Sequence, residues 1–357
     1  MGQFRKRLII TAAAGIFAVS SLMGCSSRSM DNEAIVAEVG GEKISLGVAN
    51  FYARMQQAQY ESYYASFLGT AGEEMWTQDM GDGKTYEETT KKNVLKALED
   101  LYLLKQHAAD YEAVLTEEDE KAIDKAVSLF VEGNTLEGKE AVSGEEKYVK
   151  TFLELATIQS RMDGPMKEGV DEEVSEEEAA QKSIQYVFFS YTKSADDGNT
   201  EQMSDDEKAA LKKTAQEFAE NIKNGEDMEA AAAEKDQKVL TASFDSKSTS
   251  PSPDLIEAAD ALEKEGDVTD IVETDNGIYV AKLTSMLDRE ATDAKKTSIV
   301  EERKQKQYDS LLEDWRKATD IKEHKSVWKK VSFIDQGVSI KENTEESADK
   351  TTSESDK

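Results

Sequence analysis

The stretch Ser183-Ile184-Gln185-Tyr186-Val187-Phe188-Phe189 marks a change of pattern along the chain. Its β-branched and aromatic residues form a short apolar run, which favours a buried strand over a helix. Helical patterns follow, and then Asn276-Gly277 leads into the apolar run Ile278 to Leu283, as in a turn between two strands. The order strand, helices, strand, turn, strand therefore predicts a small module with sheet and helix over residues 183–288.

The residues before this module predict a helical domain over residues 34–167. It opens with two short strands around Gly40-Gly41, and a helix follows in which Val48, Phe51, Tyr52 and Met55 are spaced for one face. Further helices follow, one of them opened by a capping box at Thr116-Glu117-Glu118-Asp119. The acidic residues 168–182 are predicted to be a linker.

The residues after the module return to a helical pattern. A long helix is predicted to run to about Thr319, and the alternation in Val327 to Phe333 predicts a final strand, so that residues 289–334 complete the first domain. Residues 335–357 contain no aromatic residue and few apolar ones, and we expect a disordered tail. The predicted fold class is α+β, a helical domain built from N- and C-terminal segments with the module inserted.

The composition disfavours several classes of function. A net charge of −30 would repel nucleic acid. One cysteine and two histidines allow no intrachain disulfide and no Cys/His zinc site, and no glycine-rich phosphate loop follows a predicted strand, so we expect no metal and no cofactor. The 74 acidic residues leave open a carboxylate pair for glycoside hydrolysis, although pairs such as Glu117-Glu118 fit solvated helix starts better.

The first 25 residues predict export. Arg5, Lys6 and Arg7 precede an apolar run that ends in Leu22-Met23-Gly24-Cys25, the pattern of a secretory signal. This ending resembles a bacterial lipobox, which implies cleavage before Cys25, lipidation of its thiol and anchoring to the outer face of the cytoplasmic membrane. Residues 1–24 would then be the signal peptide and residues 25–33 a tether. The alternative is an ordinary signal peptide with a cysteine near its cleavage site.

Three stretches in this order resemble the PrsA-type and SurA-type extracytoplasmic foldases. Val36 to Ser45 is similar to the start of their chaperone domain, and Ala261 to Thr269 and Asn276 to Leu283 are similar to stretches of their parvulin-like (PpiC-type) peptidyl-prolyl isomerase domain. The resemblance implies a SurA-like helical chaperone domain with an inserted parvulin-like module at residues 183–288.

The parvulin-like module departs from the family at its site. Tyr186 and Tyr279 stand at the positions of the two family histidines, so the isomerase pocket is predicted to be degenerate. The resemblance places Phe244 and Leu255 in the proline pocket and makes Asp236 the nearest candidate for the group that faces the twisted amide. The histidines of this chain, His107 and His324, lie outside the module.

Three functions follow from these observations. The first is a lipid-anchored chaperone or foldase that binds unfolded or partly folded secreted polypeptides, with weak or absent isomerase activity. The second is an active isomerase in which tyrosines replace the histidines, and the third, disfavoured because repeated βαβ units are missing, is a solute-binding lipoprotein. The membrane would be contacted through the anchor only, and whether the protein forms a homodimer stays open. The candidate client-binding residues are Phe51, Tyr52, Met55, Tyr60, Tyr63, Tyr64 and Phe67.

Overall fold

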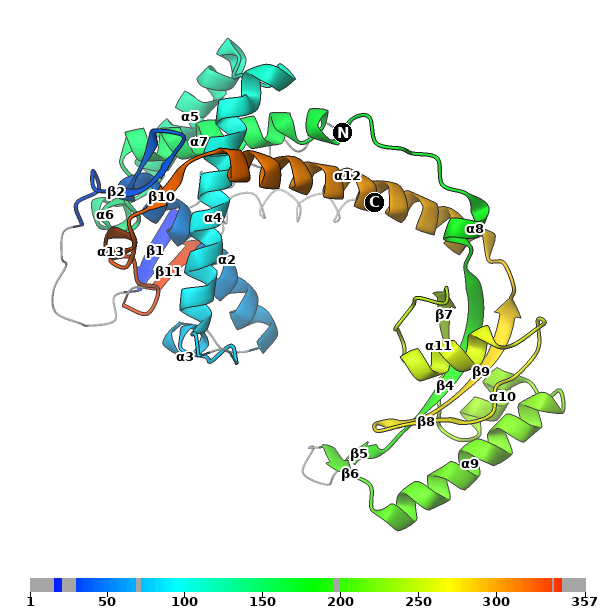
Figure 1. Ribbon diagram of the computed structural model, residues 1–357. Coiled ribbons are helices and arrows are strands. Elements are labelled where there is room, and N and C mark those ends of the chain that lie inside the picture. The colour runs from blue at the N-terminus through cyan, green and yellow to red at the C-terminus, as the bar shows by residue number, and fades with distance from the viewer. Residues whose placement is uncertain are drawn as a thin grey trace, which may run out of the picture. The chain divides into compact units, whose positions relative to one another are not determined.

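The structure, a computed structural model, describes residues 16–20, 30–68, 72–81, 83–194, 200–335 and 337–341 (Figure 1). The chain divides into two compact units. Unit 1 consists of residues 1–169 and 305–357, and unit 2 consists of residues 170–304. The fold class is α+β, as the sequence predicts, and unit 1 is discontinuous because its C-terminal part follows unit 2 in the sequence.

Unit 1 contains a three-stranded antiparallel sheet in the order β10-β2-β3. Strands β2 (Ile35–Val39) and β3 (Glu42–Ser45) form a hairpin through Gly40 and Gly41, which both have positive φ. Strand β10 (Ile321–Glu323) pairs with β2, with Ile321 opposite Val39. The C-terminal segment thus completes a sheet that the N-terminal segment begins.

Helices make up most of unit 1. The Thr116 capping box is confirmed, since the side chains of Thr116 and Asp119 each bind the other residue's backbone N–H. Phe51 lies at the centre of the core, with its ring 5.4 Å from that of Phe130 and 5.6 Å from that of Phe152. The helices are α2 (Leu46–Leu68), α3 (Glu73–Trp76), α4 (Tyr86–His107), α5 (Glu117–Gly133), α6 (Leu136–Val142), α7 (Glu146–Met162) and α13 (Lys325–Trp328), with 3-10 turns at Ala108–Tyr111 and Pro165–Lys167. Helix α12 (Arg289–Ala318) contributes residues to both units.

A buried polar network fixes the C-terminal segment to α2 and α4. Arg54 is fully buried; it donates to the carbonyl oxygen of Ser332 at 2.9 Å and to Gln57 Oε1 at 2.6 Å. Gln57 donates to the carbonyl oxygen of Phe333, and the backbone N–H of Phe333 donates to Glu87 Oε1 at 2.6 Å. The Phe333 ring is buried 4.8 Å from Trp76. Side chains rather than a neighbouring strand therefore satisfy this backbone.

This network explains why the predicted strand over Val327 to Phe333 is wrong. The segment consists of the end of α13 followed by irregular backbone. The alternating apolar residues do mark buried side chains, because Val331 and Phe333 are buried. The backbone of this segment, however, is hydrogen-bonded to side chains of α2 and α4 and not to a neighbouring strand. The returning strand is β10, a few residues earlier.

The expected disorder of residues 335–357 is also wrong in part. Residues Gly337–Lys341 form β11, which pairs antiparallel with β1 (Ile16–Ser20), as Figure 1 shows. The sequence-based expectation missed this strand because its partner comes from the predicted signal peptide, at the other end of the chain. The remaining residues of the predicted signal peptide and residues 342–357 lie outside the described residues.

Unit 2 is built on a four-stranded antiparallel sheet in the order β7-β4-β9-β8. Its central strands are β4 (Lys182–Ser190) and β9 (Gly277–Ser285), flanked by β7 (Leu240–Phe244) and β8 (Val272–Thr274). Strands β5 (Thr192–Ser194) and β6 (Thr200–Gln202) pair separately. The helices are α8 (Glu176–Ala179), α9 (Asp205–Lys223), α10 (Met228–Ala233) and α11 (Pro253–Asp260).

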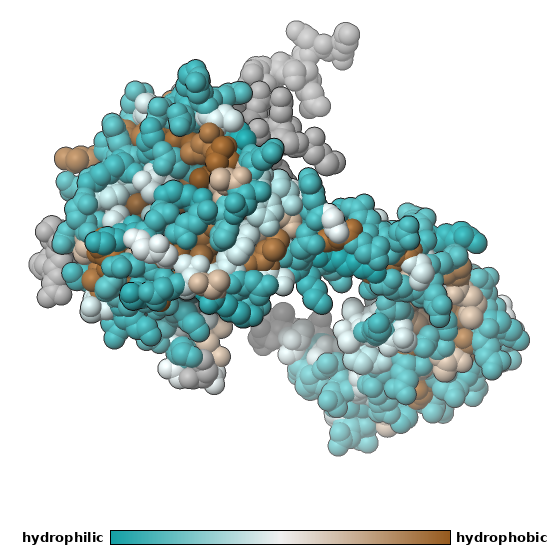
Figure 2. Space-filling model, turned by 45° about the horizontal axis from the view of Figure 1, so that its top comes forward, coloured by the Kyte–Doolittle hydropathy of each residue, from teal (hydrophilic) through white to brown (hydrophobic). Residues whose placement is uncertain are grey.

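The two faces of this sheet carry separate cores. Val187 and Phe189 of β4 pack with α9 and α10, whereas Ile184 and Tyr186 of the same strand pack on the α11 side. This division follows from the alternation of side chains along a strand. Figure 2 shows that hydrophilic residues cover most of the visible surface, in keeping with 33% charged residues.

Arg316 neutralises a buried carboxylate in unit 1, and its loss should be costly. It donates to Glu99 Oε2 at 2.7 Å and to Asp100 Oδ1 at 2.6 Å, and the Glu99 side chain is only 1% exposed. Arg316→Met should lower the free energy of unfolding at pH 7 by about 3 kcal/mol, because it leaves a buried charge without its partner. The measurement is denaturant unfolding of the whole chain.

The pH dependence of this loss tests its cause. Burial raises the pKa of Glu99 above the usual glutamate range, so the folded state binds the proton more tightly than the unfolded state. The deficit of Arg316→Met should therefore shrink as the pH falls from 7 to 5. Lys317→Met, which removes exposed ion pairs only, is the matched control and should change stability little. A deficit that is the same at both pH values would contradict this explanation.

Gly47 should tolerate no side chain. A Cβ at this position would lie 2.3 Å from Cζ of Tyr148, whose hydroxyl donates to Glu33 at 2.8 Å. Gly47→Ala should lower the free energy of unfolding by about 1–3 kcal/mol, because the buried ring must move. The control is the same substitution in a Tyr148→Ala background, where the ring with which the Cβ would clash is absent and Gly47→Ala should cost little. An equal loss of stability in both backgrounds would contradict the prediction.

Candidate functional site

The structure brings Tyr186 and Tyr279 together on one face of the sheet in unit 2. They lie on the paired central strands, where Tyr186 is opposite Ala281 and Tyr279 is opposite Phe188. Their ring centroids are 6.0 Å apart at an interplanar angle of 50°. Both side chains are half-buried at the edge of the α11-side core. The two positions that resemble the family histidines therefore form an aromatic pair.

A third aromatic residue, Phe188, belongs to the same face and was missed by the sequence analysis. Its ring centroid lies 4.4 Å from that of Tyr279, at an interplanar angle of 31°. Gly277 permits this packing, because a Cβ at that position would lie 2.6 Å from Cε2 of Phe188 and 2.3 Å from the carbonyl oxygen of Phe189. The alternation of β4 contained the signal, since residues 184, 186 and 188 must share a face. We call Tyr186, Phe188 and Tyr279 the aromatic face.

The hydroxyl of Tyr279 is held in its protonated form. Burial raises the pKa of Tyr279, and the neighbouring Tyr186 raises it further. A phenol is already protonated at neutral pH, so Tyr279 is a hydrogen-bond donor there, and the shift extends this state to higher pH. The aromatic face combines stacking surface with at least one hydroxyl that can donate to a carbonyl oxygen.

The other predicted pocket residues do not join this face as surface groups. Phe244 and Leu255 are fully buried in the core under α11, together with Ile184 and Ala281. Phe244 belongs to β7 and Leu255 to α11, and both are core residues because α11 packs on this part of the sheet. Asp236 is exposed at positive φ in the turn after α10, whose alanines pack on the opposite face of the sheet. The structure thus does not place Asp236 opposite the tyrosines.

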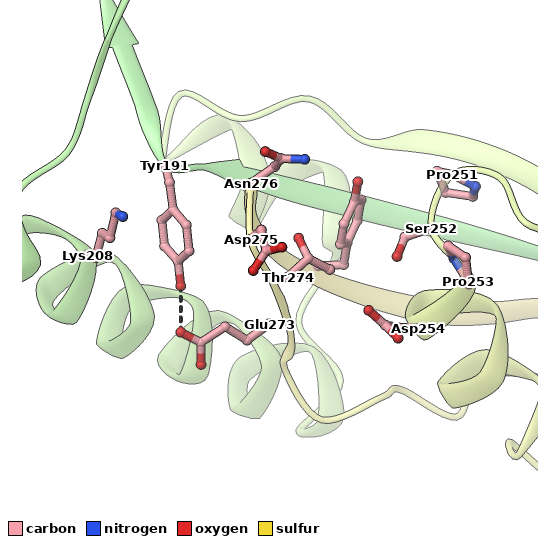
Figure 3. A pocket seen from close by; sticks show the side chains of 11 residues that line it. Tyr191, Lys208, Pro251, Ser252, Pro253, Asp254, Glu273, Thr274, Asp275 and Asn276 are labelled. Atoms are coloured by element: carbon pink, nitrogen blue, oxygen red, sulfur yellow. Dashed lines mark hydrogen bonds between the residues drawn. The ribbon is translucent and has the colours of Figure 1, made fainter. Parts of the chain in front are cut away.

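A solvent-open pocket of about 760 Å³ begins at Tyr279. Figure 3 shows the start of α11 on one side, the turn between β8 and β9 in the middle, and Tyr191 with Lys208 on the other side. Polar and acidic groups predominate in the lining. The lining residues are Tyr191, Lys208, Pro251, Ser252, Pro253, Asp254, Glu273, Thr274, Asp275, Asn276 and Tyr279.

Hydrogen bonds fix the far end of this pocket. The hydroxyl of Tyr191 donates to Glu273 Oε1 at 2.7 Å (Figure 3), and Lys208 Nζ lies 5.1 Å from the centroid of the Tyr191 ring. Lys212 and Tyr191 hold the pKa of Glu273 below its usual range, and burial raises the pKa of Tyr191 to about 12. At neutral pH the pocket therefore contains an ionised carboxylate and a neutral phenol, and it suits polar or basic peptide groups better than an isolated apolar ring.

The aromatic residues of α2 divide into core and surface. Phe51 and Met55 are buried in the core of unit 1, so the prediction that they line a client-binding surface is not supported. Tyr52 stacks on Phe152, and Tyr60 and Tyr64 pack against Tyr86. Tyr63 is 58% exposed. The side chain of Phe67 lies outside the described residues, although its backbone belongs to α2.

The predicted lipidation site is not among the residues that the structure describes, since Cys25 falls between the described residues 16–20 and 30–68. In the described part of the chain, no helix is long and apolar enough to cross a membrane.

Residues 191–297 match the family model described as the PPIC-type PPIASE domain. This chain therefore carries a PPIC-type peptidyl-prolyl isomerase domain, and the predicted resemblance to that class is confirmed. The match includes Tyr279, Phe244, Leu255 and Asp236 and begins five residues after Tyr186.

The chain is similar to several solved structures of PrsA proteins. The foldase protein PrsA from Streptococcus pneumoniae is 18% identical, with a TM-score of 0.30, over 71% of this chain and 96% of that chain. The peptidylprolyl isomerase PrsA from Bacillus cereus is 16% identical, with a TM-score of 0.32, over 84% of this chain and 99% of that chain. The PrsA from Bacillus anthracis is 20% identical, with a TM-score of 0.27, over 63% and 96% of the two chains. No curated protein matches this chain.

The protonation of Tyr279 can be measured directly. In the chain labelled with ¹³Cζ-tyrosine, the Tyr279 signal should titrate above pH 10, because burial and Tyr186 both disfavour its phenolate. Tyr186→Phe should move this pKa down, since it removes the neighbouring phenolate. Tyr191→Phe is the control and should leave it unchanged, and Tyr279→Phe assigns the signal. A Tyr279 pKa of 10 or below would contradict the described packing.

Proposed function

We propose that this protein is an extracytoplasmic folding factor, anchored by a lipid on Cys25, that binds unfolded secreted polypeptides and has weak or no prolyl isomerase activity. The observation that carries the proposal is the aromatic pair of Tyr186 and Tyr279, whose ring centroids are 6.0 Å apart, at the two positions that the family resemblance assigns to histidines. Tyr279 lies within the segment that matches the PPIC-type domain, and Tyr186 lies just before it. The lipobox-like ending at Cys25 and the basic, apolar leader support export and anchoring.

The pocket favours peptide binding over catalysis. Isomerisation must lower a barrier of about 18–20 kcal/mol, and this requires an enclosed, dry site that holds the proline ring and the twisted amide. Phe244 and Leu255 are buried in the core, and the pocket beside Tyr279 is open and lined by polar groups. An extended segment could stack on the aromatic face and accept a hydrogen bond from Tyr279. These features support binding with little acceleration of isomerisation.

A second candidate function is isomerase activity through the tyrosines. The place of Tyr279 beside Tyr186 favours it, because a phenol is neutral at physiological pH and donates to a carbonyl oxygen, as a histidine N–H does. This second function would use the same aromatic face as the first, and a measurement of prolyl isomerase activity distinguishes the two.

An exchange assay on X-Pro peptides separates the two functions. NMR exchange rates should show acceleration of less than about ten-fold over the uncatalysed rate with the chain at micromolar concentration, since the site is not closed. If the rate is well above this, the Tyr186→Phe, Tyr279→Phe double variant should abolish it while Tyr111→Phe, a substitution in unit 1, should not. That result would replace the first function by the second.

The folding function has its own readout. The chain lacking residues 1–24, with Cys25→Ser to prevent modification, should suppress light scattering by reduced insulin at an equimolar ratio. Replacing the aromatic face with Tyr186→Ala and Tyr279→Ala should weaken suppression, and Tyr111→Ala is the matched control for loss of a half-buried tyrosine. Aggregation that proceeds unchanged in the presence of the unsubstituted chain would refute the proposed function.

A further inference from the structure

The pairing of β1 with β11 joins the predicted signal peptide to the C-terminal part of unit 1. The ladder is antiparallel over five residue pairs, from Ile16 opposite Lys341 to Ser20 opposite Gly337. Among the described strands, β11 has no ladder partner other than β1. The predicted cleavage before Cys25 would remove β1 and leave the whole of β11 in the processed chain.

Contacts within unit 1 hold the start of this C-terminal segment independently of β1. Arg54 and Gln57 of α2 bind the carbonyl oxygens of Ser332 and Phe333, and Glu87 of α4 accepts from the N–H of Phe333. Lys91 of α4 donates to the carbonyl oxygen of Val331. Strand β11 itself lies beside α2, and Val338 belongs to the core of unit 1. We expect these contacts to hold β11 in place after cleavage, when it has no strand partner among the described residues and the edge that β1 occupied is vacated.

An unpaired strand edge exposes main-chain donors and acceptors that need partners. We propose that in the processed chain the edge of β11 vacated by β1 binds an extended apolar segment of an unfolded polypeptide by strand addition. This inference rests on the proposed function and adds to the aromatic face of unit 2 a second client-binding site, in unit 1. The signal-peptide strand would occupy that site until cleavage and so would prevent client binding before export is complete.

The chemistry of β1 indicates which segments fit. This strand is extended, and its sequence Ile-Phe-Ala-Val-Ser is apolar and rich in residues that favour strands. Strand addition obtains its affinity from main-chain hydrogen bonds, so it tolerates different side-chain sequences, as a folding factor with many clients requires. Pairing between two processed copies is opposed by their net charge, which is −30 for the full sequence and falls to −33 when Arg5, Lys6 and Arg7 are removed. The favoured occupant is therefore an apolar client segment.

The test uses a fluorescent peptide with the sequence of residues 14–22. It should bind saturably to chain 25–357 carrying Cys25→Ser, and at least about ten-fold more weakly to the full chain carrying the same substitution, in which β1 already occupies the edge. Circular dichroism and thermal unfolding of both chains show whether the processed form folds. If chain 25–357 is unfolded without β1, the edge is not a preformed site and the proposal is overturned.

Two N-methylated versions of the peptide test the strand geometry. Along an antiparallel strand alternate N–H groups point to the partner, so methylation at Ile16, Ala18 and Ser20 and methylation at Phe17 and Val19 affect opposite edges. One set should weaken binding about ten-fold or more, by loss of two or three hydrogen bonds, and the other should bind as the parent does. Equal binding by both sets, or no saturable binding of the parent, would overturn strand addition.

Competition identifies the occupant. Reduced, carboxymethylated α-lactalbumin, which is permanently unfolded, should displace the parent peptide from chain 25–357. If the chain suppresses insulin aggregation but the unfolded protein does not displace the peptide, the proposed function stands and this site is overturned. If sedimentation shows a dimer that the peptide dissociates, a second copy occupies the edge and the client assignment is overturned as well.

Discussion

The buried guanidinium of Arg54 is the interaction on which unit 1 depends. Burial lowers the pKa of Arg54 to about 10, yet the group stays charged at neutral pH, and a charge inside a core must be hydrogen-bonded. Its partners are Asn50 and Gln57 of its own helix and the carbonyl oxygen of Ser332. Because Ser332 follows unit 2 in the sequence, one side chain of α2 helps to close a domain that the second unit interrupts.

The sheet of unit 2 shows how strand pairing can gather aromatic side chains on one face. The register of β4 and β9 places Tyr186, Phe188 and Tyr279 on one face, and this arrangement is a consequence of strand pairing alone. What an isomerase also requires is an enclosure over that face, and here Phe244 and Leu255 are buried under α11 while polar groups line the opening beside Tyr279. The register therefore provides an aromatic surface without an enclosure.

The sequence predicted those features that depend on local pattern. The strands that carry Tyr186 and Tyr279 were predicted from their apolar residues, and the capping box at Thr116 from its residue types. That the two tyrosines belong to one site was implied by the family resemblance. Burial was harder to predict. Whether an aromatic residue such as Phe51 or Phe244 lies in the core depends on which helix covers it, and the local sequence does not show this. The backbone of Val331 to Phe333 was assigned to a strand because nothing local reveals that Arg54, far away in sequence, binds it. Strand β11 was missed for the same reason.

The interruption of unit 1 also determines the order in which the parts of the protein can fold. The chain emerges from its N-terminus, and unit 2 is complete once residue 304 is available, because all its strands and their partners lie within residues 170–304. Unit 1 must wait for β10 and for the Ser332 carbonyl, which lies 278 residues from Arg54. During this interval α2 carries a charged side chain whose carbonyl partner has not yet arrived. Unit 1 therefore cannot be completed until residues beyond unit 2 are available.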